Sequence, residues 1–293
     1  MKIIVLKFGG TSVGSIHRIK KVAKIIKSYS KKYNVIVLSS AMSGTTNKLI
    51  NMSQKICKNF ADNEYDALVS AGEQISCSLL AGQLLSEGIK SRSWMAWQIP
   101  ILTEGKHKYS RIKYINKTKI YKYLKSGGIP IIAGFQGVDK NLNITTIGRG
   151  GSDSSAIMVA KFFKADRCVI YTDVQGIYTT DPNKLISAKK IKNISYEEML
   201  EMASLGSKVM QPHSIQDARL NRINIEVRSS FVNRSGTLIT KRKNIVNNKI
   251  ITGISSTNND AKVTLLGVRD RPGIAASIFK PLYLNSINVD MVV

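Results

Sequence analysis

The residues best suited to chemistry lie in the segment T-T-I-G-R-G-G-S-D-S-S-A, residues 145–156. Its closely spaced glycines leave the backbone free to adopt positive φ and to approach a ligand closely. Arg149 stands among them as a fixed cation whose guanidinium suits a carboxylate or a phosphate. Ser152 and Asp153 follow at the predicted start of a helix, where free N–H groups attract anions. The segment therefore predicts an anion site, and a glycine-rich turn that caps an ordinary helix is the alternative.

A second candidate is the segment K-F-G-G-T-S at residues 7–12. Lys7 ends the apolar run 2–7, and open α/β sheets bind ligands at the carboxyl ends of their strands. Gly9 and Gly10 can bring backbone N–H groups against phosphates. The glycine pattern fits neither a Walker A loop nor a dinucleotide fingerprint. The alternative is that Lys7 is a surface lysine at a strand end.

Two further polar groups lie next to apolar segments. Glu73 is surrounded in sequence by Ala, Ile, Cys and Leu, so its carboxylate must be solvated or meet a cation. A substrate ammonium and a structural salt bridge both remain open for it. Thr46 lies in a hydroxyl-rich loop that follows the predicted strand 34–40. It caps a helix, contacts a ligand, or does both.

A third loop follows the predicted strand 167–173 and is suited to a nucleotide base and ribose. Its polar candidates are Thr172, Asp173, Tyr178 and Asp181. Such segments are also ordinary turns, so the pattern is weak by itself. Lys208 is the cation of the junction G-S-K-V-M between two predicted helices.

The elements that must position these loops alternate as strand, glycine-rich loop and helix, which is typical of an α/β fold with a mostly parallel sheet. We expect one or two helices over 62–88, a basic loop at 106–113 and a hairpin over 134–146. The polar stretch 241–249 breaks the periodicity and predicts a domain boundary near residue 247.

The segment that follows this boundary predicts a β–α–β unit. Its first strand is expected over 261–268, its helix over 274–285 and its second strand over 287–293. The unit ends on a strand that is still apolar. Such an edge strand is expected to pair with another chain or to aggregate.

The composition is globular, with 43% hydrophobic and 22% charged residues in 293. The net charge of +25 would suit nucleic acid, but the lysines are scattered and no aromatic residues interleave with them. We therefore expect no nucleic-acid partner and a surface that attracts anionic substrates. No apolar run reaches the roughly 18–20 residues of a membrane span. The first residues indicate a strand and not a signal peptide.

The cysteines and histidines favour neither a zinc site nor a disulfide framework. Cys57, Cys77 and Cys168 form no C-x-x-C pair, and the three histidines are isolated. This pattern is compatible with a reducing cytoplasm.

Seven motifs in order give the chain a specific resemblance. They are K-F-G-G-T-S (7–12), S-A-M-S-G-T-T (40–46), A-G-E (71–73), G-F-Q-G (134–137), G-R-G-G-S-D (148–153), Y-T-D-V-Q-G-I-Y-T-T-D-P (171–182) and E-E-M-L-E-M-A-S-L-G-S-K-V (197–209). With them the chain resembles an aspartokinase of the amino acid kinase superfamily over essentially its whole length. The final segment resembles the first part of an ACT regulatory domain, whereas family members typically carry two ACT units.

The resemblance implies a fold, a reaction and two domains. The fold would be a three-layer α/β/α sandwich, with a kinase domain over 1–246 and a partial ACT domain over 247–293. The reaction would transfer the γ-phosphoryl group of ATP, as its Mg²⁺ complex, to the β-carboxylate of L-aspartate. The product, 4-phospho-L-aspartate, begins the biosynthesis of lysine, threonine and methionine, and of diaminopimelate. The nucleophile is already an anion, so charge neutralisation and positioning matter more than a general base.

The resemblance also implies roles for single residues on the phosphate side. Lys7 would stabilise the charge of the transferring phosphoryl group. Asp153 would orient Lys7 or hold the magnesium shell through water. The phosphates and the rest of the nucleotide would be bound by Lys7, Phe8, Gly9, Gly10, Ser12, Thr172, Asp173, Tyr178, Asp181 and Lys208.

On the substrate side, Arg149 would pair with a carboxylate of aspartate and Glu73 with its α-ammonium group. The remaining substrate contacts would come from Thr46, Gly150, Ser152 and Asp153. Lysine or threonine would be the effector, with contacts at Asp270, Pro272, Gly273 or Asp290. Such regulation depends on paired ACT units, so the partial unit suggests a homo-oligomer or a partner chain that completes the domain.

Two alternatives remain open from the sequence. One is another kinase of the superfamily, acting on glutamate, acetylglutamate or a nucleoside monophosphate; the A-G-E segment and the ACT-like tail argue against it. The other is a non-catalytic or regulatory remnant. The presence of Lys7, Glu73, Arg149 and Asp153 argues against lost chemistry.

Overall fold

The chain folds into two compact units. The structure is a computed structural model that describes residues 2–207, 209–242, 251–256, 261, 263–285, 287 and 289. Its units are Met1–Ser256 and Thr257–Val293. The assignment of a kinase domain to 1–246 and of a partial ACT domain to 247–293 stays a prediction.

The larger unit is built on an eight-stranded sheet in the order β10-β12-β11-β9-β1-β2-β6-β3. Its strands are β1 (Ile3–Phe8), β2 (Asn34–Ser39), β3 (Ser91–Trp94), β6 (Ile129–Ala133), β9 (Arg167–Thr172), β10 (Asn193–Ser195), β11 (Ile225–Ser229) and β12 (Thr237–Thr240). Neighbouring strands are parallel except for the pair β11 and β12. This is the mostly parallel sheet that the alternation of strands and helices predicts.

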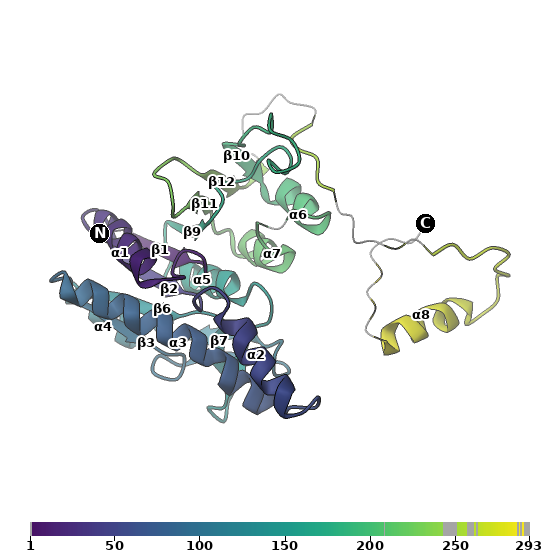
Figure 1. Cartoon of the computed structure of the whole chain (residues 1–293), viewed down its shortest axis with the longest axis horizontal. Coiled ribbons are helices and arrows are strands. Elements are labelled where there is room, and N and C mark those ends of the chain that lie inside the picture. Colours follow the sequence, from purple (N-terminus) through teal and green to yellow (C-terminus); the bar gives the residue numbers. More distant parts are fainter. Residues whose placement is uncertain are drawn as a thin grey trace. The chain divides into compact units, whose positions relative to one another are not determined.

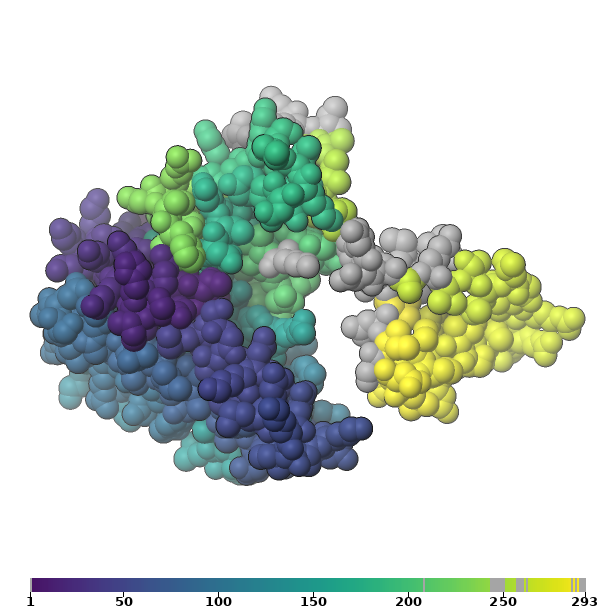
Figure 2. Space-filling view, in the orientation of Figure 1, coloured from purple at the N-terminus to yellow at the C-terminus, as the bar shows by residue number. Residues whose placement is uncertain are grey.

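Helices cover this sheet on both faces (Figure 1). They are α1 (Ile16–Ser30), α3 (Asp62–Ser86), α4 (Thr118–Lys125), α5 (Gly151–Phe162), α6 (Tyr196–Ser204) and α7 (Pro212–Asn221), whereas α2 (Thr45–Ile56) packs against α3. Alternate residues of β1 point to opposite faces: Leu6 packs in the core beneath α1 and α3, and Val5 packs in the core beneath α5 and α7. Figure 2 shows α1, α2 and α3, in purple to blue, against one another. The expected three-layer sandwich is confirmed.

The local sequence explains where these helices begin. The Ser15 side chain caps α1 by accepting a hydrogen bond from Arg18 N at 3.2 Å. Ser195 and Glu198 form a reciprocal capping box at α6. The interval 62–88, expected to hold one or two helices, forms the single helix α3. Among the described residues no helix is long and apolar enough to span a membrane.

A second sheet has four strands, and its last strand in the sequence ends at the start of the glycine-rich segment. Its order is β5-β4-β7-β8, with β4 (Ile101–Glu104), β5 (Arg111–Ile115), β7 (Gln136–Val138) and β8 (Ile144–Thr146). The predicted hairpin is confirmed, because β7 and β8 pair antiparallel. The prediction of a basic loop over 106–113 is wrong for residues 111–113, which belong to β5. The exposed cations of β5 alternate with the buried Ile112, and pairing with β4 satisfies its backbone.

The smaller unit holds one helix among its described residues, α8 (Ile274–Leu284). This confirms the predicted helix, which begins after Gly273 at φ 86°. The predicted strand 261–268 is wrong for the described residues 263–268, which form no strand and are exposed. Strands need a neighbour that bonds their backbone groups, and these residues have none among the described part of the chain. Most of the second predicted strand, with Asp290, lies outside the described residues.

Candidate active site

Four loops leave the same edge of the large sheet. In the strand register, Phe8 at the end of β1 is paired with Ser39 of β2 and with Tyr171 of β9, and Ser39 is paired with Ala133 of β6. Parallel strands that end level with one another place the loops that follow side by side. This edge carries K-F-G-G-T-S, the loop before α2, the segment after β6 and the loop after β9.

Lys7 and Asp153 meet at this edge. The Lys7 ammonium Nζ lies 2.6 Å from Asp153 Oδ1, and each side chain is 11% exposed. A buried charge is stable only when an opposite charge compensates it, so the two side chains depend on one another. The two segments singled out by their glycines therefore belong to one site.

Glu73 is the third ionisable group of the site and is 3% exposed. The backbone N–H of Ala41 donates to its Oε1 at 3.1 Å. Its Oε2 is buried and accepts no hydrogen bond from the described residues. Burial raises the pKa of Glu73 to about 8, although the hydrogen bond from Ala41 and the charge of Lys7 lower it. A buried acceptor without a donor is suited to a cationic ligand group.

Gly72 of the A-G-E segment is required sterically, in addition to the role of the Glu73 carboxylate. A Cβ at Gly72 would lie 2.8 Å from Ala41 Cβ and 3.4 Å from Thr45 Cγ2. Glycine therefore lets the loop 41–45 approach α3 closely enough for Ala41 to bond Glu73. Thr46 lies in the first turn of α2 directly after that loop and is half-buried.

The glycine-rich segment leaves its cation unpaired. Gly148 and Gly150 adopt φ of 82° and 69°, and Gly150 precedes the first turn of α5. Arg149 between them is exposed and forms no ion pair with the described residues. The N–H of Ser152 donates to no backbone carbonyl of the described chain. These free donors fit the predicted anion site, and Ser152 packs at 3.1–3.3 Å from a Cβ placed on Gly134.

The phosphate-loop residues differ in part from expectation. Gly9 N donates to Tyr171 O at 3.0 Å, so this N–H is not free for a phosphate. Gly10 and Thr11 have N–H groups that donate to no backbone carbonyl in the described parts of the chain. The Phe8 ring is fully buried and stacks on Tyr171 at 4.8 Å, which leaves only its backbone for a ligand.

Ser12 takes part in a buried hydroxyl chain that the sequence pattern does not reveal. Ser230 Oγ donates to Ser12 Oγ at 2.8 Å, and Arg18 Nη2 donates to Ser230 Oγ at 2.8 Å. Ser230 follows β11, so these contacts tie the phosphate loop to a distant part of the sequence. Hydroxyl groups are too common in a sequence for this pairing to be read from it.

The expected nucleotide residues follow β9. Thr172 Oγ1 donates to Asp173 Oδ1 at 3.0 Å, and Asp173 is exposed. Asp181 Oδ1 accepts from Asn183 N at 2.9 Å, so this carboxylate also stabilises its own turn. Tyr178 forms an isolated bridge with Lys190. No hydrogen bond among the described residues joins this group to Lys7 or Asp153, and Lys208 lies outside the described residues.

Asp66 is a buried residue near the site that sequence analysis misses. Its carboxylate is 0% exposed and accepts from Thr146 Oγ1 at 2.5 Å and from Lys108 N at 3.1 Å. His107 Nδ1 lies 2.7 Å from Asp66 Oδ2. These bonds fasten α3 to the end of β8, directly before the segment with Arg149. The available signal is the spacing of seven residues between Asp66 and Glu73, which places both on one helix face.

The described residues contain no cluster of His, Cys, Asp or Glu that could hold a metal ion by itself. Asp153 is the carboxylate beside Lys7. A divalent cation at this edge would therefore need ligands from a bound phosphate compound.

The sheet order, with an ion pair and free N–H groups at the carboxyl edge, defines a phosphate-handling α/β enzyme. The sequence profile of the amino acid kinase family matches residues 2–229, and the chain belongs to this family. It is 45% identical over 295 residues to an aspartate kinase of Pseudomonas putida, covering 100% of this chain and 72% of that protein.

Two solved structures of E. coli aspartokinase III share the fold. The complex with aspartate and ADP gives a TM-score of 0.78 at 25% identity, covering 100% of this chain and 76% of that one. The complex with lysine and aspartate gives a TM-score of 0.80 at 25% identity, covering 100% and 77%. The resemblance seen in the motifs is thereby confirmed.

Proposed function

We propose that the chain catalyses the transfer of the γ-phosphoryl group of ATP to the β-carboxylate of L-aspartate, giving 4-phospho-L-aspartate. This is the step that begins lysine, threonine, methionine and diaminopimelate biosynthesis. Its support is the family and the match to an aspartokinase that binds aspartate and ADP. The observation that carries it is the convergence of Lys7, Asp153 and the open Glu73 oxygen at one sheet edge.

The chemistry asks mainly for charge neutralisation. A carboxylate nucleophile needs no general base, and negative charge gathers on the phosphoryl oxygens as the group moves. Lys7 is the cation available to stabilise that charge, and the free N–H groups of Gly10 and Thr11 add donors for the phosphates. Because Asp153 holds the ammonium at 2.6 Å, Lys7 is already oriented before any ligand binds.

Aspartate would be recognised through both of its charged ends. Glu73 Oε2 is the acceptor for the α-ammonium group, and ionisation of Glu73 is favoured when that cation arrives. Arg149 is free to form a bidentate pair with a carboxylate through its guanidinium. Thr46, Gly150 and Ser152 supply further donors around the same substrate.

The nucleotide would occupy the loops after β1 and β9. Phe8, Gly9, Gly10 and Ser12 shape the phosphate side, with Gly9 acting through its missing Cβ, which would lie 3.6 Å from Lys7 Nζ. The base and ribose side comprises Thr172, Asp173, Tyr178, Asp181 and Lys208. Mg²⁺ would be held by the ATP phosphates and by Asp153 through water, and it supplies further neutralisation of the transferring group.

The proposal extends to the cellular compartment and the assembly of the enzyme. The three cysteines are unpaired, which suits the reducing cytoplasm. The partial ACT domain over 247–293 and a homo-oligomeric state, or a partner chain that completes the ACT unit, are carried over from the resemblance. Lysine is bound by one of the matched aspartokinase structures, and lysine or threonine is the effector to test here, with Asp270, Pro272 and Gly273 as candidate contacts.

The experiment is a coupled assay of ADP release with purified chain, ATP, Mg²⁺ and a panel of acceptors. We expect release that depends on aspartate, and little with glutamate, acetylglutamate or a nucleoside monophosphate. Turnover with another acceptor would instead support a different kinase of the family. A folded sample without any acceptor-dependent turnover would support the non-catalytic alternative.

A further inference from the structure

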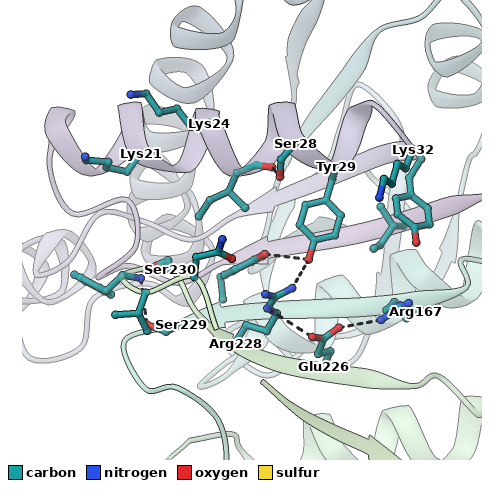
Figure 3. A pocket seen from close by; sticks show the side chains of 17 residues that line it. Lys21, Lys24, Ser28, Tyr29, Lys32, Arg167, Glu226, Arg228, Ser229 and Ser230 are labelled. Atoms are coloured by element: carbon teal, nitrogen blue, oxygen red, sulfur yellow. Dashed lines mark hydrogen bonds and ion pairs between the residues drawn. The ribbon is translucent and has the colours of Figure 1, made fainter. Parts of the chain in front are cut away.

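A cavity of about 710 Å³ lies beside α1, and its lining includes neither Lys7 nor Asp153 (Figure 3). One wall is formed by Lys21 and Lys24 of α1 and by Lys32, which follows the end of this helix. The opposite wall comes from β9 and β11, with Arg167 and Arg228. This volume lies within the range of about 300–1,000 Å³ in which proteins bind small molecules.

The lining is strongly basic. Among the described residues that form it, five are cationic, and Glu226 is the single carboxylate. That carboxylate is already engaged, because Arg167 Nη1 donates to its Oε2 at 3.0 Å and Arg228 Nε lies 3.6 Å from its Oε1. The three lysines line the cavity, and no carboxylate of its lining pairs with them. Cations brought together in a concave surface attract a compact anion more strongly than scattered ones.

The cations of the cavity are gathered by structure as well as by composition. Lys21, Lys24 and Ser28 share one face of α1 because they recur at helical spacing, and Lys32 follows the end of the helix. Lys20 of α1 and Lys31, the residue that ends the helix, do not line the cavity. A lysine-rich composition alone would give no such separation of faces.

One hydrogen-bond chain fixes donors inside the cavity. Tyr171 Oη donates to Tyr29 Oη at 3.1 Å, and Arg228 Nη1 donates to the same oxygen at 2.9 Å. The Tyr29 oxygen thus accepts twice, and its own hydrogen remains for another acceptor. Arg228 is held further by Arg234 O, and its buried Nε makes no hydrogen bond with the described residues. Both residues therefore present donors that an anion would satisfy.

We propose that this cavity is a second binding site, specific for a small molecule that carries at least two linked phosphate groups. A planar guanidinium and a cluster of ammonium groups are the side chains that bind phosphate oxygens best. A ligand with one carboxylate would leave most of the five cations uncompensated.

Two residues that line the cavity also contact the phosphate loop 7–12, but Lys7 of that loop does not line the cavity. Tyr171 accepts the N–H of Gly9 at 3.0 Å, and Ser230 donates to Ser12 at 2.8 Å, so both lie between the two sites. Since Lys7 lies outside this lining, the two sites can be separated by substitution, and binding at the second site does not require the proposed activity.

The test is calorimetric titration of the full chain with inorganic tripolyphosphate. We expect saturable binding. The double variant Lys21→Ala/Lys24→Ala should raise the dissociation constant about tenfold or more, because two charge-assisted contacts are lost. The matched control Lys20→Ala/Lys31→Ala removes the same charge from α1 and the residue that ends it, outside the lining, and should change the dissociation constant less than about threefold. Lys7→Ala should leave this binding in place.

Three results would overturn the proposal. Equal weakening by the two lysine pairs would show only general attraction to a basic surface. Loss of binding in Lys7→Ala but not in Lys21→Ala/Lys24→Ala would place the phosphates in the active site. Absence of saturable tripolyphosphate binding, even if an acidic polymer binds the same face, would exclude a small-molecule site. Circular dichroism of each variant establishes that it is folded.

Discussion

The Lys7 ammonium and the Asp153 carboxylate form an ion pair of 2.6 Å in which both side chains are 11% exposed. The first residue ends a strand and the second begins a helix, so two separate segments complete one charged centre. In a pair so far removed from water, each partner depends on the other. Orientation of the cation is thus built into the fold.

Replacing Lys7 with Ala tests this centre. We expect kcat to fall by about 10²–10⁴, equivalent to roughly 3–5 kcal/mol, because the cation acts on charge that develops during transfer. Steady-state kinetics with ATP and aspartate measures the change, and Lys2→Ala, an exposed lysine of the same segment, is the control. A change confined to KM would argue against the assigned role.

Replacing Glu73 with Gln should raise the KM for aspartate at least tenfold and leave the KM for ATP within about twofold. The amide keeps an acceptor for Ala41 N–H but loses the charge that an ammonium group requires. Kinetics with each substrate varied in turn separates the two constants. If the KM for ATP rose as much as that for aspartate, Glu73 would not be a specific ammonium partner.

The raised pKa of Glu73 makes stability depend on pH. Between the ordinary glutamate value and about 8 the folded chain holds a proton that the unfolded chain has released. The contribution of Glu73 to the free energy of unfolding therefore falls as pH rises through this interval, by about 1.4 kcal/mol per pH unit. Urea unfolding from pH 5 to 9 should show a smaller decline for Glu73→Gln. Equal slopes would mean that the carboxyl is not buried in its neutral form.

Aspartate binding should release a proton below pH 8. The free enzyme holds Glu73 largely protonated there, and the arriving ammonium favours the ionised carboxylate. Calorimetric titration of aspartate at pH 7 in two buffers of different ionisation enthalpy measures the proton number. We expect a release that disappears in Glu73→Gln; an unchanged release in that variant would assign the proton elsewhere.

Replacing Asp66 with Ala should destabilise the chain by about 3 kcal/mol, because Thr146, Lys108 N–H and His107 lose their buried partner. The KM for aspartate should also rise, since the segment with Arg149 follows Thr146. Asp62→Ala, on the same helix as Asp66, removes an exposed ion pair with Lys108 and should leave stability nearly unchanged. Urea unfolding of the two variants compares them directly.

A glycine pair tests the geometry of the Arg149 segment. Gly150→Ala places a Cβ at φ 69° and 2.6 Å from Gln211 Cγ, so we expect a loss of about 1–2 kcal/mol and weaker aspartate binding. Gly82→Ala lies in α3, where a Cβ meets nothing within 4 Å, and should stabilise by about 0.5–1 kcal/mol. Thermal unfolding of both variants would refute this view if their shifts had the same sign.

Local patterns were sufficient for much of the fold. Apolar runs that break into glycines located β1, β2 and β9 with the helices that follow, because these signals are contained in a few neighbouring residues. The strand β5 was missed, since its exposed cations hide a short alternation that only pairing with β4 stabilises. The strand expected at 261–268 fails for a similar reason, because apolar content alone provides no partner strand.

Site residues could be predicted where the functional side chains lie within one loop. Contacts between segments that are distant in the sequence could not be predicted. The residue types around Lys7 and Arg149 indicated anion binding by themselves. By contrast, the bond from Gly9 N–H to Tyr171 and the chain from Arg18 through Ser230 to Ser12 depend on the order of strands in the sheet. Nothing in the neighbouring residues specifies such contacts.

The most direct test is the identity of the phosphorylated product. The purified chain is incubated with ATP, Mg²⁺ and aspartate, and hydroxylamine traps any acyl phosphate as a hydroxamate. We expect aspartate hydroxamate in an amount equal to the ADP released, and neither product above background for Lys7→Ala. ADP release from the folded enzyme without any hydroxamate would contradict phosphoryl transfer to the aspartate carboxylate.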